Sequence, residues 1–224
     1  MEDVLMRAPL FSALDVEAAA ALQESMEVRR LLRGEVLFAE GEPGDRLYVV
    51  TDGKVKLGHT ATDGRESLIA IIGEGEMCGE LSLFDPGPRT STATALTDVR
   101  ALGLGHTALR PWLTGRPEVA ESLLQALAQR LRRTNEALGD LVFSDVPGRV
   151  AKALLDLGDR FGRPGPEGVL VTHDMTQEEL AQLVGASRET VNKALADFAS
   201  RGWLTLESRS VVLLDVERLQ RRAR

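Results

Sequence analysis

The feature that most constrains this chain is a long helical segment with a regular apolar seam, from Pro117 to Phe143. Proline suits the first turn of a helix because the N–H that it lacks has no partner there. About 26 helical residues span roughly 40 Å. The apolar positions recur at intervals of 3, 4, 3, 4 and 3, which is the spacing of a coiled-coil seam. The seam positions are Leu124, Leu127, Leu131, Thr134, Leu138 and Leu141.

The residues around this seam favour a helix shared between two chains. Most off-seam positions, such as Gln129 and Glu136, are too polar for a helix enclosed on all sides. We therefore predict a parallel two-stranded dimerisation helix over residues 116–143, the alternative being a buried helix of a monomer. One seam position is polar, Thr134, and Asn135 follows it. This pair either fixes register and partner number or faces something polar, and the sequence alone leaves both readings open.

The residues before the helix have the pattern of a small β protein. Apolar runs of strand length (VLFAE, RLYVVT, KVKLGHT, ESLIAIIG and VRALGLG) are separated by GEPGD, DG, DGR and GEGE. Strands of this length and spacing predict a compact all-β roll or barrel over residues 1–115. Ahead of the strands, SALDVEAAAALQESM predicts a short helix capped by Ser12 or Asp15.

The residues after the seam helix predict a third kind of structure. SDVPGR predicts a hinge at residues 144–148, because a proline disfavours helix before it and a glycine loosens the chain after it. Residues 149–224 then form a separate domain, in which VAKALLDLGDRFG is an amphipathic helix and RPGPEG a loop.

Two short helices joined by a glycine dominate this last domain. Thr176 and Glu179 form a capping box for a helix that runs to about Leu183. Gly185 supplies the positive φ of a sharp turn, and Ser187 caps a second helix, RETVNKALADFASRG. Two such helices match the helix-turn-helix unit. The runs WLTLE and SVVLLD, on either side of SRS, predict a β-hairpin wing.

The first turns of the second helix predict DNA binding. Arg188 can hold guanine O6 and N7 with two hydrogen bonds, and Glu189 can accept from a cytosine amine. Lys193, one turn on, can reach a base edge or a phosphate. The alternative is a solvated face of an ordinary helical domain. Hydroxyls suited to phosphates are those of Thr176, Ser187 and Thr190.

The stretch GELSLFDPGPRTST, residues 79–92, places one arginine and several hydroxyls behind a tight turn in strand-rich sequence. A planar guanidinium holds two phosphate oxygens and stays charged at any working pH. Arg89 is therefore either an anion ligand or a structural salt-bridge partner, and the residues alone leave both open.

Composition limits what else the chain can be. The net charge of −7 lies entirely before Ser144, and the last domain is balanced. Cys78 is the only cysteine, which excludes an internal disulfide and a cysteine-ligated zinc or iron–sulfur site. There is no run of about 18 apolar residues and no secretory signal, so we expect a cytoplasmic protein with no membrane partner. Scattered histidines and the lack of a nucleotide-hydrolysis loop or nucleophile motif predict no enzymatic activity.

The order of these segments resembles the cyclic-AMP receptor protein (CRP/FNR) family of bacterial transcription regulators over essentially the whole chain. The likeness is strongest to its actinobacterial members, which share FDPGPRTS and RLRRTN. It implies an α+β fold: a jelly-roll-like cyclic-nucleotide-binding β-roll, a long dimerisation helix and a winged helix-turn-helix domain. It also implies a homodimer that binds one cyclic AMP per subunit, no metal, pseudo-palindromic TGTGA-like double-stranded DNA, and RNA polymerase as a partner.

The resemblance assigns roles to the turn and to the polar pair of the helix. Glu80 accepts from the ribose 2′-hydroxyl, Arg89 pairs with the cyclic phosphate, and Thr90 assists it. The backbone around Gly79, Leu81 and Ser82 lines the sugar and phosphate. Thr134 of one subunit and Asn135 of its partner contact the adenine.

Three positions depart from the family's enteric pattern: Thr90, Asn135 and Lys193. A threonine at the first is also typical of cyclic-GMP-selective domains, so the choice between the two nucleotides stays open. Lysine replaces a two-pronged arginine at the third, which predicts a less strictly read half-site. Alternatives are a haem sensor using Cys78 or His106, and a regulatory subunit that restrains an enzyme. The second would leave the helix-turn-helix unused.

Overall fold

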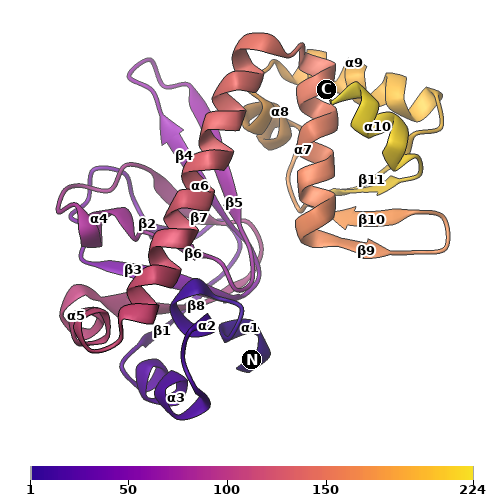
Figure 1. Cartoon of the computed structure of the whole chain (residues 1–224). Helices are drawn as coiled ribbons and strands as arrows, with labels where there is room; N and C mark the ends of the chain where they lie inside the picture. The colour runs from indigo at the N-terminus through magenta and orange to yellow at the C-terminus, as the bar shows by residue number, and fades with distance from the viewer. Residues whose placement is uncertain (1, 224) are drawn as a thin grey trace. The chain divides into compact units, whose positions relative to one another are not determined.

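The computed structural model describes residues 2–223, which form two compact units divided between Arg132 and Arg133 (Figure 1). The boundary falls inside the long helix α6 (Pro117–Phe143). Each unit has its own core and is described separately.

Two four-stranded antiparallel sheets make up the first unit, in the strand orders β1-β8-β3-β6 and β2-β7-β4-β5. The predicted β-roll is thus confirmed. Three strands, β1, β6 and β7, were not predicted, because they are polar or very short. The strands are β1 (Glu27–Leu31), β2 (Val36–Phe38), β3 (Arg46–Asp52), β4 (Val55–Thr60), β5 (Glu66–Ile72), β6 (Met77–Cys78), β7 (Thr92–Ala95) and β8 (Val99–Gly105).

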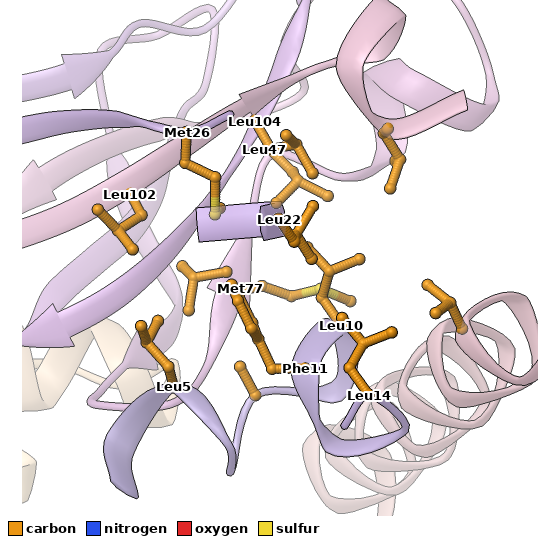
Figure 2. Packing of buried hydrophobic residues seen from close by; sticks show 14 of the residues in the cluster. Leu5, Leu10, Phe11, Leu14, Leu22, Met26, Leu47, Met77, Leu102 and Leu104 are labelled. Carbon is orange, nitrogen blue, oxygen red and sulfur yellow. The ribbon is translucent and has the colours of Figure 1, made fainter. Parts of the chain in front are cut away.

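The central strand β3 of the first sheet is buried on both faces. In β3, Tyr48 and Val50 point into a core shared with the second sheet, while Leu47 and Val49 belong to a core under the N-terminal helices (Figure 2). This burial on two sides explains why LYVV within RLYVVT is an unbroken apolar run. A strand with one face in solvent instead alternates apolar and polar residues. The helices are α1 (Glu2–Leu5), α2 (Pro9–Ser12), α3 (Val16–Glu24), α4 (Leu81–Phe84) and α5 (His106–Gly115).

The helix predicted ahead of the strands is α3, and its cap is Asp15 rather than Ser12. The Asp15 carboxylate accepts a hydrogen bond of 2.8 Å from the backbone N–H of Ala18. Ser12 instead ends α2. Helices α4 and α5 were not predicted: α4 is one turn long, and α5 contains Pro111.

The long helix α6 has the predicted extent and a mixed environment. Val119 and Leu123 are fully buried in the core of the first unit. Four of the five seam leucines, by contrast, are exposed over half or more of their surface: 66% for Leu124, 61% for Leu131, 56% for Leu138 and 52% for Leu141, whereas Leu127 is half-buried. A helix enclosed within a monomer would not leave these side chains in water, so that alternative does not fit.

The second unit contains the predicted helix-turn-helix and wing. Its antiparallel sheet has the order β11-β12-β10-β9. The loop prediction is wrong for Arg163 and Pro164, which pair with β10. The elements are α7 (Val146–Phe161), β9 (Gly162–Pro164), β10 (Val169–Thr172), α8 (Gln177–Val184), α9 (Arg188–Ser200), β11 (Leu204–Glu207), β12 (Ser210–Leu213) and α10 (Val216–Arg222).

The residues predicted as a hinge are largely helical. Helix α6 ends at Phe143 and α7 already begins at Val146, so Pro147 and Gly148 lie in its first turn. Proline is tolerated there, and the Asp145 carboxylate caps the turn by accepting 2.9 Å from the Gly148 N–H. The interruption is confined to residues 144 and 145, and its role as a hinge stays a prediction.

Asp145 is also held by the C-terminal helix. Arg222 of α10 donates from Nη2 to its second carboxylate oxygen at 2.6 Å. This hydrogen bond, together with the Gly148 N–H, lowers the pKa of Asp145 below its ordinary value of 3.8. The folded chain therefore releases this proton more readily than the unfolded chain. The stabilisation is present above pH 3.8 and is lost as the pH falls through the folded-state pKa.

We predict that Arg222→Ala lowers the free energy of unfolding of the second unit at neutral pH, and that the deficit shrinks as the pH falls below about 4. Urea denaturation across the acid range measures it. The matched control is Arg221→Ala, which removes a neighbour paired only with Glu217 at 3.8 Å. A deficit that is the same at every pH would show that the ion pair with Asp145 contributes nothing.

Candidate functional site

The turn that carries Arg89 is fastened to the loop between β2 and β3. The Arg89 N–H donates to the Glu42 carbonyl at 2.8 Å, and the Arg89 carbonyl accepts from the Gly41 N–H at 2.9 Å. Pro43 and Pro88 form an isolated bridge beside them. These contacts aim the side chain into the roll, where only 4% of Arg89 is exposed.

The Arg89 guanidinium is held by neutral groups. Its Nη1 donates to the Gly79 carbonyl and its Nη2 to the Arg46 carbonyl, each at 2.8 Å. Its Nε is buried and has no hydrogen-bond partner. Within residues 2–223 no carboxylate forms an ion pair with it. The salt-bridge reading of Arg89 is therefore not what the structure shows.

Two glycines let the backbone approach this side chain. Gly79 has φ +80°, and a Cβ there would lie 2.7 Å from Arg89 Nη1. A Cβ on Gly44 would lie 2.1 Å from the Cβ of Ser82 and 3.3 Å from Arg89 Nε. The unpartnered Nε and the Ser82 side chain thus meet around Gly44, in the interior of the roll.

Glu80 is the second buried charge of this region, with 1% of the residue exposed. Its Oε1 accepts 2.7 Å from Nη1 of Arg130 on α6, while its Oε2 is buried without a hydrogen-bond partner. The sequence reasoning missed Arg130. The signal that could have found it is its place one helical turn before Thr134, on the same helix face.

The other predicted ligand residues lie in different surroundings. Ser82 is buried, whereas Leu81 and Thr90 are exposed. Thr134 and Asn135 are exposed on α6 and belong to the second unit. The structure therefore brings together Gly79, Glu80, Ser82 and Arg89, and adds Arg130.

Cys78 lies beside this site and is fully buried. Burial raises the pKa of its thiol to about 12, so the thiol stays protonated at neutral pH. In the part of the chain that the structure describes, no three His, Cys, Asp or Glu side chains are grouped to hold a metal ion. No described helix is long and apolar enough to cross a bilayer.

The second unit presents a polar helix face in the way the sequence predicts. Helix α9 buries Val191, Leu195 and Phe198. The opposite face exposes Glu189 and Lys193, which pair at 2.7 Å. The other predicted residues lie in the first turn of α9 or at the N-caps of α8 and α9. The exposed predicted residues are Thr176, Ser187, Arg188, Glu189, Thr190 and Lys193.

The turn between α8 and α9 has the predicted local chemistry. Thr176 and Glu179 form a complete capping box, and the Ser187 hydroxyl accepts from the Thr190 N–H at 3.2 Å. Gly185 is left-handed, with φ 64°. Sequence reasoning missed Arg149, which donates to the carbonyls of Val184 at 2.9 Å and Gly185 at 3.2 Å.

We predict that Gly79→Ala destabilises the first unit by about 1–3 kcal/mol, because alanine is strained at positive φ and its methyl group meets Arg89. Thermal unfolding measures the loss. The control is Gly87→Ala, on the other side of α4, where the nearest atom to an added Cβ is 3.8 Å away. Equal stability of the two variants would rule out the close packing of Gly79 against the guanidinium.

Comparison with known proteins agrees with this geometry. Residues 28–114 match the family described as "Cyclic nucleotide-binding domain", and residues 148–222 match "Crp-like helix-turn-helix domain". The "CRP-like cAMP-activated global transcriptional regulator" of Mycobacterium tuberculosis is 59% identical over 100% of both chains. The "Cyclic AMP receptor protein" of Thermus thermophilus is 35% identical over 92% of this chain and 95% of its own.

Solved structures show the same architecture. One is the structure of the regulator CLP of Xanthomonas campestris, a protein described as a c-di-GMP responsive global regulator. It has a TM-score of 0.73 and 28% identity, and the match covers 89% of this chain and 99% of that one. The Mycobacterium relative is named a transcriptional regulator. The chain therefore belongs to the CRP-like family of transcription regulators, with a cyclic-nucleotide-binding domain followed by a CRP-like helix-turn-helix domain.

Proposed function

We propose that this chain is a cyclic-AMP-activated, homodimeric regulator that binds specific DNA, with one cyclic AMP in each β-roll. The observation that carries the proposal is the pair of buried opposite charges, Arg89 and Glu80. Each has one buried polar atom without a partner, Nε and Oε2 respectively. A buried polar atom without a hydrogen bond is costly, so a ligand that supplies both partners is favoured.

A cyclic nucleotide has the matching groups. Its phosphate carries one negative charge and accepts hydrogen bonds from a guanidinium, as Arg89 would supply. Its ribose 2′-hydroxyl donates a proton that Glu80 Oε2 can accept. The Ser82 side chain and the backbone of Gly79 and Leu81 would line the sugar and phosphate, with the Thr90 hydroxyl assisting Arg89.

The names of the relatives point to the same ligand and also leave one question for experiment. Two relatives are named for cyclic AMP, one of them 59% identical over its full length. The Xanthomonas regulator is described as responsive to a different nucleotide. Together with Thr90, this makes competition between nucleotides part of the test.

The exposed stripe on α6 supports the dimer. Leucines that are 52–66% exposed at coiled-coil spacing would be buried by the same stripe of a second chain. In such a dimer Thr134 of one subunit and Asn135 of its partner would contact the base, so that the ligand spans the seam. In the proposed division, residues 1–115 bind nucleotide, 116–143 dimerise, 144–148 flex and 149–224 bind DNA.

The exposed face of α9 supports DNA recognition. Two such helices in a dimer would enter successive major grooves about 34 Å apart on a pseudo-palindromic, TGTGA-like site. Arg188 would read guanine and Glu189 cytosine, while Thr176, Ser187 and Thr190 would contact phosphates. Lys193 already pairs with Glu189, so it would share that carboxylate with the DNA. The regulator would act in the cytoplasm with RNA polymerase.

Cyclic AMP would act by shifting an equilibrium between two arrangements of the seam helix and hinge. A ligand shifts such an equilibrium only as far as its affinity differs between the two states. By linkage, operator DNA must then change the affinity for cyclic AMP by the same factor as cyclic AMP changes the affinity for DNA.

The first functional prediction concerns nucleotide binding. It is tested by calorimetry of the intact protein with cyclic AMP or cyclic GMP, in the presence and absence of a palindromic operator. We expect one cyclic AMP per chain, tighter binding when operator is present, and weaker binding of cyclic GMP. Arg89→Leu should abolish the ligand response and leave the protein dimeric. Unchanged nucleotide affinity in that variant would remove the pocket assignment, and a monomer by sedimentation would remove the dimer.

The second functional prediction concerns the recognition helix. Arg188→Ala should weaken operator binding by about 1–3 kcal/mol and relax the preference at one base position. Mobility shifts on a panel of single-base operator variants measure this. Arg201→Ala is the control, because that residue lies at the far end of α9 and pairs with Asp197. An equal loss with Arg188→Ala on every sequence would mean that the residue contacts only the backbone.

A further inference from the structure

An aromatic ring lies beneath the Arg89 guanidinium. The Arg89 Cζ is 4.3 Å from the centre of the Phe38 ring, and 7% of Phe38 is exposed. The ring in turn stacks on Tyr48, with centroids 5.9 Å apart and planes 20° apart. Because Phe38 is on β2 and Tyr48 on β3, the arginine and the two rings form a column that joins both sheets.

The surroundings of the column restrict how the guanidinium can turn. Carbonyls of Gly79 and Arg46 fix two of its nitrogens at the edge. A Cβ on Gly79 would lie 3.3 Å from Phe38 Cε1, so backbone, ring and guanidinium are in mutual contact. All donors of a guanidinium lie in one plane, and they match two phosphate oxygens only when that plane is aimed at them.

We propose that Phe38 is a positioning residue for anion recognition, whose ring sets the plane of the Arg89 guanidinium and so selects between the two exocyclic oxygens of a cyclic phosphate. The inference rests on the proposed function. The Phe38 ring faces the Arg89 guanidinium, which has no carboxylate partner. A desolvated cation over an aromatic face is stabilised by the ring quadrupole. An aliphatic side chain of similar size would fill the space, but the two carbonyl hydrogen bonds alone would leave the plane able to tilt about the line that joins Nη1 and Nη2.

The test compares Phe38→Leu with the wild-type protein, using cyclic AMP and its two phosphorothioate diastereomers, in which sulfur replaces one or the other exocyclic oxygen. Wild-type protein should prefer one diastereomer. Phe38→Leu should bind cyclic AMP about tenfold more weakly and should lose most of the preference between diastereomers. Phe38→Tyr, which keeps the ring, should restore the preference. The three affinities are measured by calorimetry or by competition with a fluorescent cyclic nucleotide.

Two controls separate positioning from packing. Ile72→Val trims the same core cluster and should lower the melting temperature without changing the diastereomer ratio. Arg89→Lys replaces the planar guanidinium with an ammonium group, which has no plane to orient. In this variant, adding Phe38→Leu should leave the ratio of the two diastereomer affinities unchanged. A ratio unaffected by Phe38→Leu in the wild-type background overturns the inference. Failure of the wild-type protein to bind cyclic AMP would instead overturn the proposed function.

Discussion

The first unit depends on one unusual interaction, a buried arginine whose charge is not matched by a carboxylate. Taking an ion out of water costs several kcal/mol, and arginine cannot avoid that cost by losing its proton. Two backbone carbonyls and an aromatic face offset part of it around Arg89. These groups are neutral, so the positive charge of Arg89 is not neutralised. For this reason an anionic ligand is expected to bind inside the roll.

The placement of Arg89 depends on the sheets around it. Strands β3 and β8 of the first sheet contribute to two cores, so this part of the sheet is a wall between the interior of the roll and the N-terminal helices. Helix α6 is fastened to the helix-covered side of that wall by Val119 and Leu123, and the same helix supplies Arg130 to Glu80. The buried carboxylate is thus the direct link between the roll and α6. A ribose hydroxyl on its free oxygen would act on an ion pair that already involves the helix.

Local chemistry could be read from the sequence and distant contacts could not. The long helix over residues 117–143, the capping box at Thr176 and the left-handed Gly185 follow from residues within a few positions of one another, and all three are confirmed. Arg130 lies 50 residues from Glu80 in the sequence. Phe38 contacts Arg89 because backbone hydrogen bonds join the loop after β2 to the turn before β7. The prediction that Val146 is not helical is wrong because the Asp145 cap outweighs the local effect of the proline.

Contacts within the second unit join the residues around the interruption between α6 and α7 to the helix-turn-helix. Arg149 donates to the Ser144 carbonyl at 2.7 Å and, with the same guanidinium, to Val184 and Gly185. Lys152 pairs with Asp140 at 2.6 Å. The ion pair joins the last turn of α6 to α7, and Arg149 joins Ser144, the residue after α6, to the turn between α8 and α9. Because one guanidinium holds the residue after α6 and the turn together, a displacement of Ser144 would strain the bonds to that turn unless Arg149 released them.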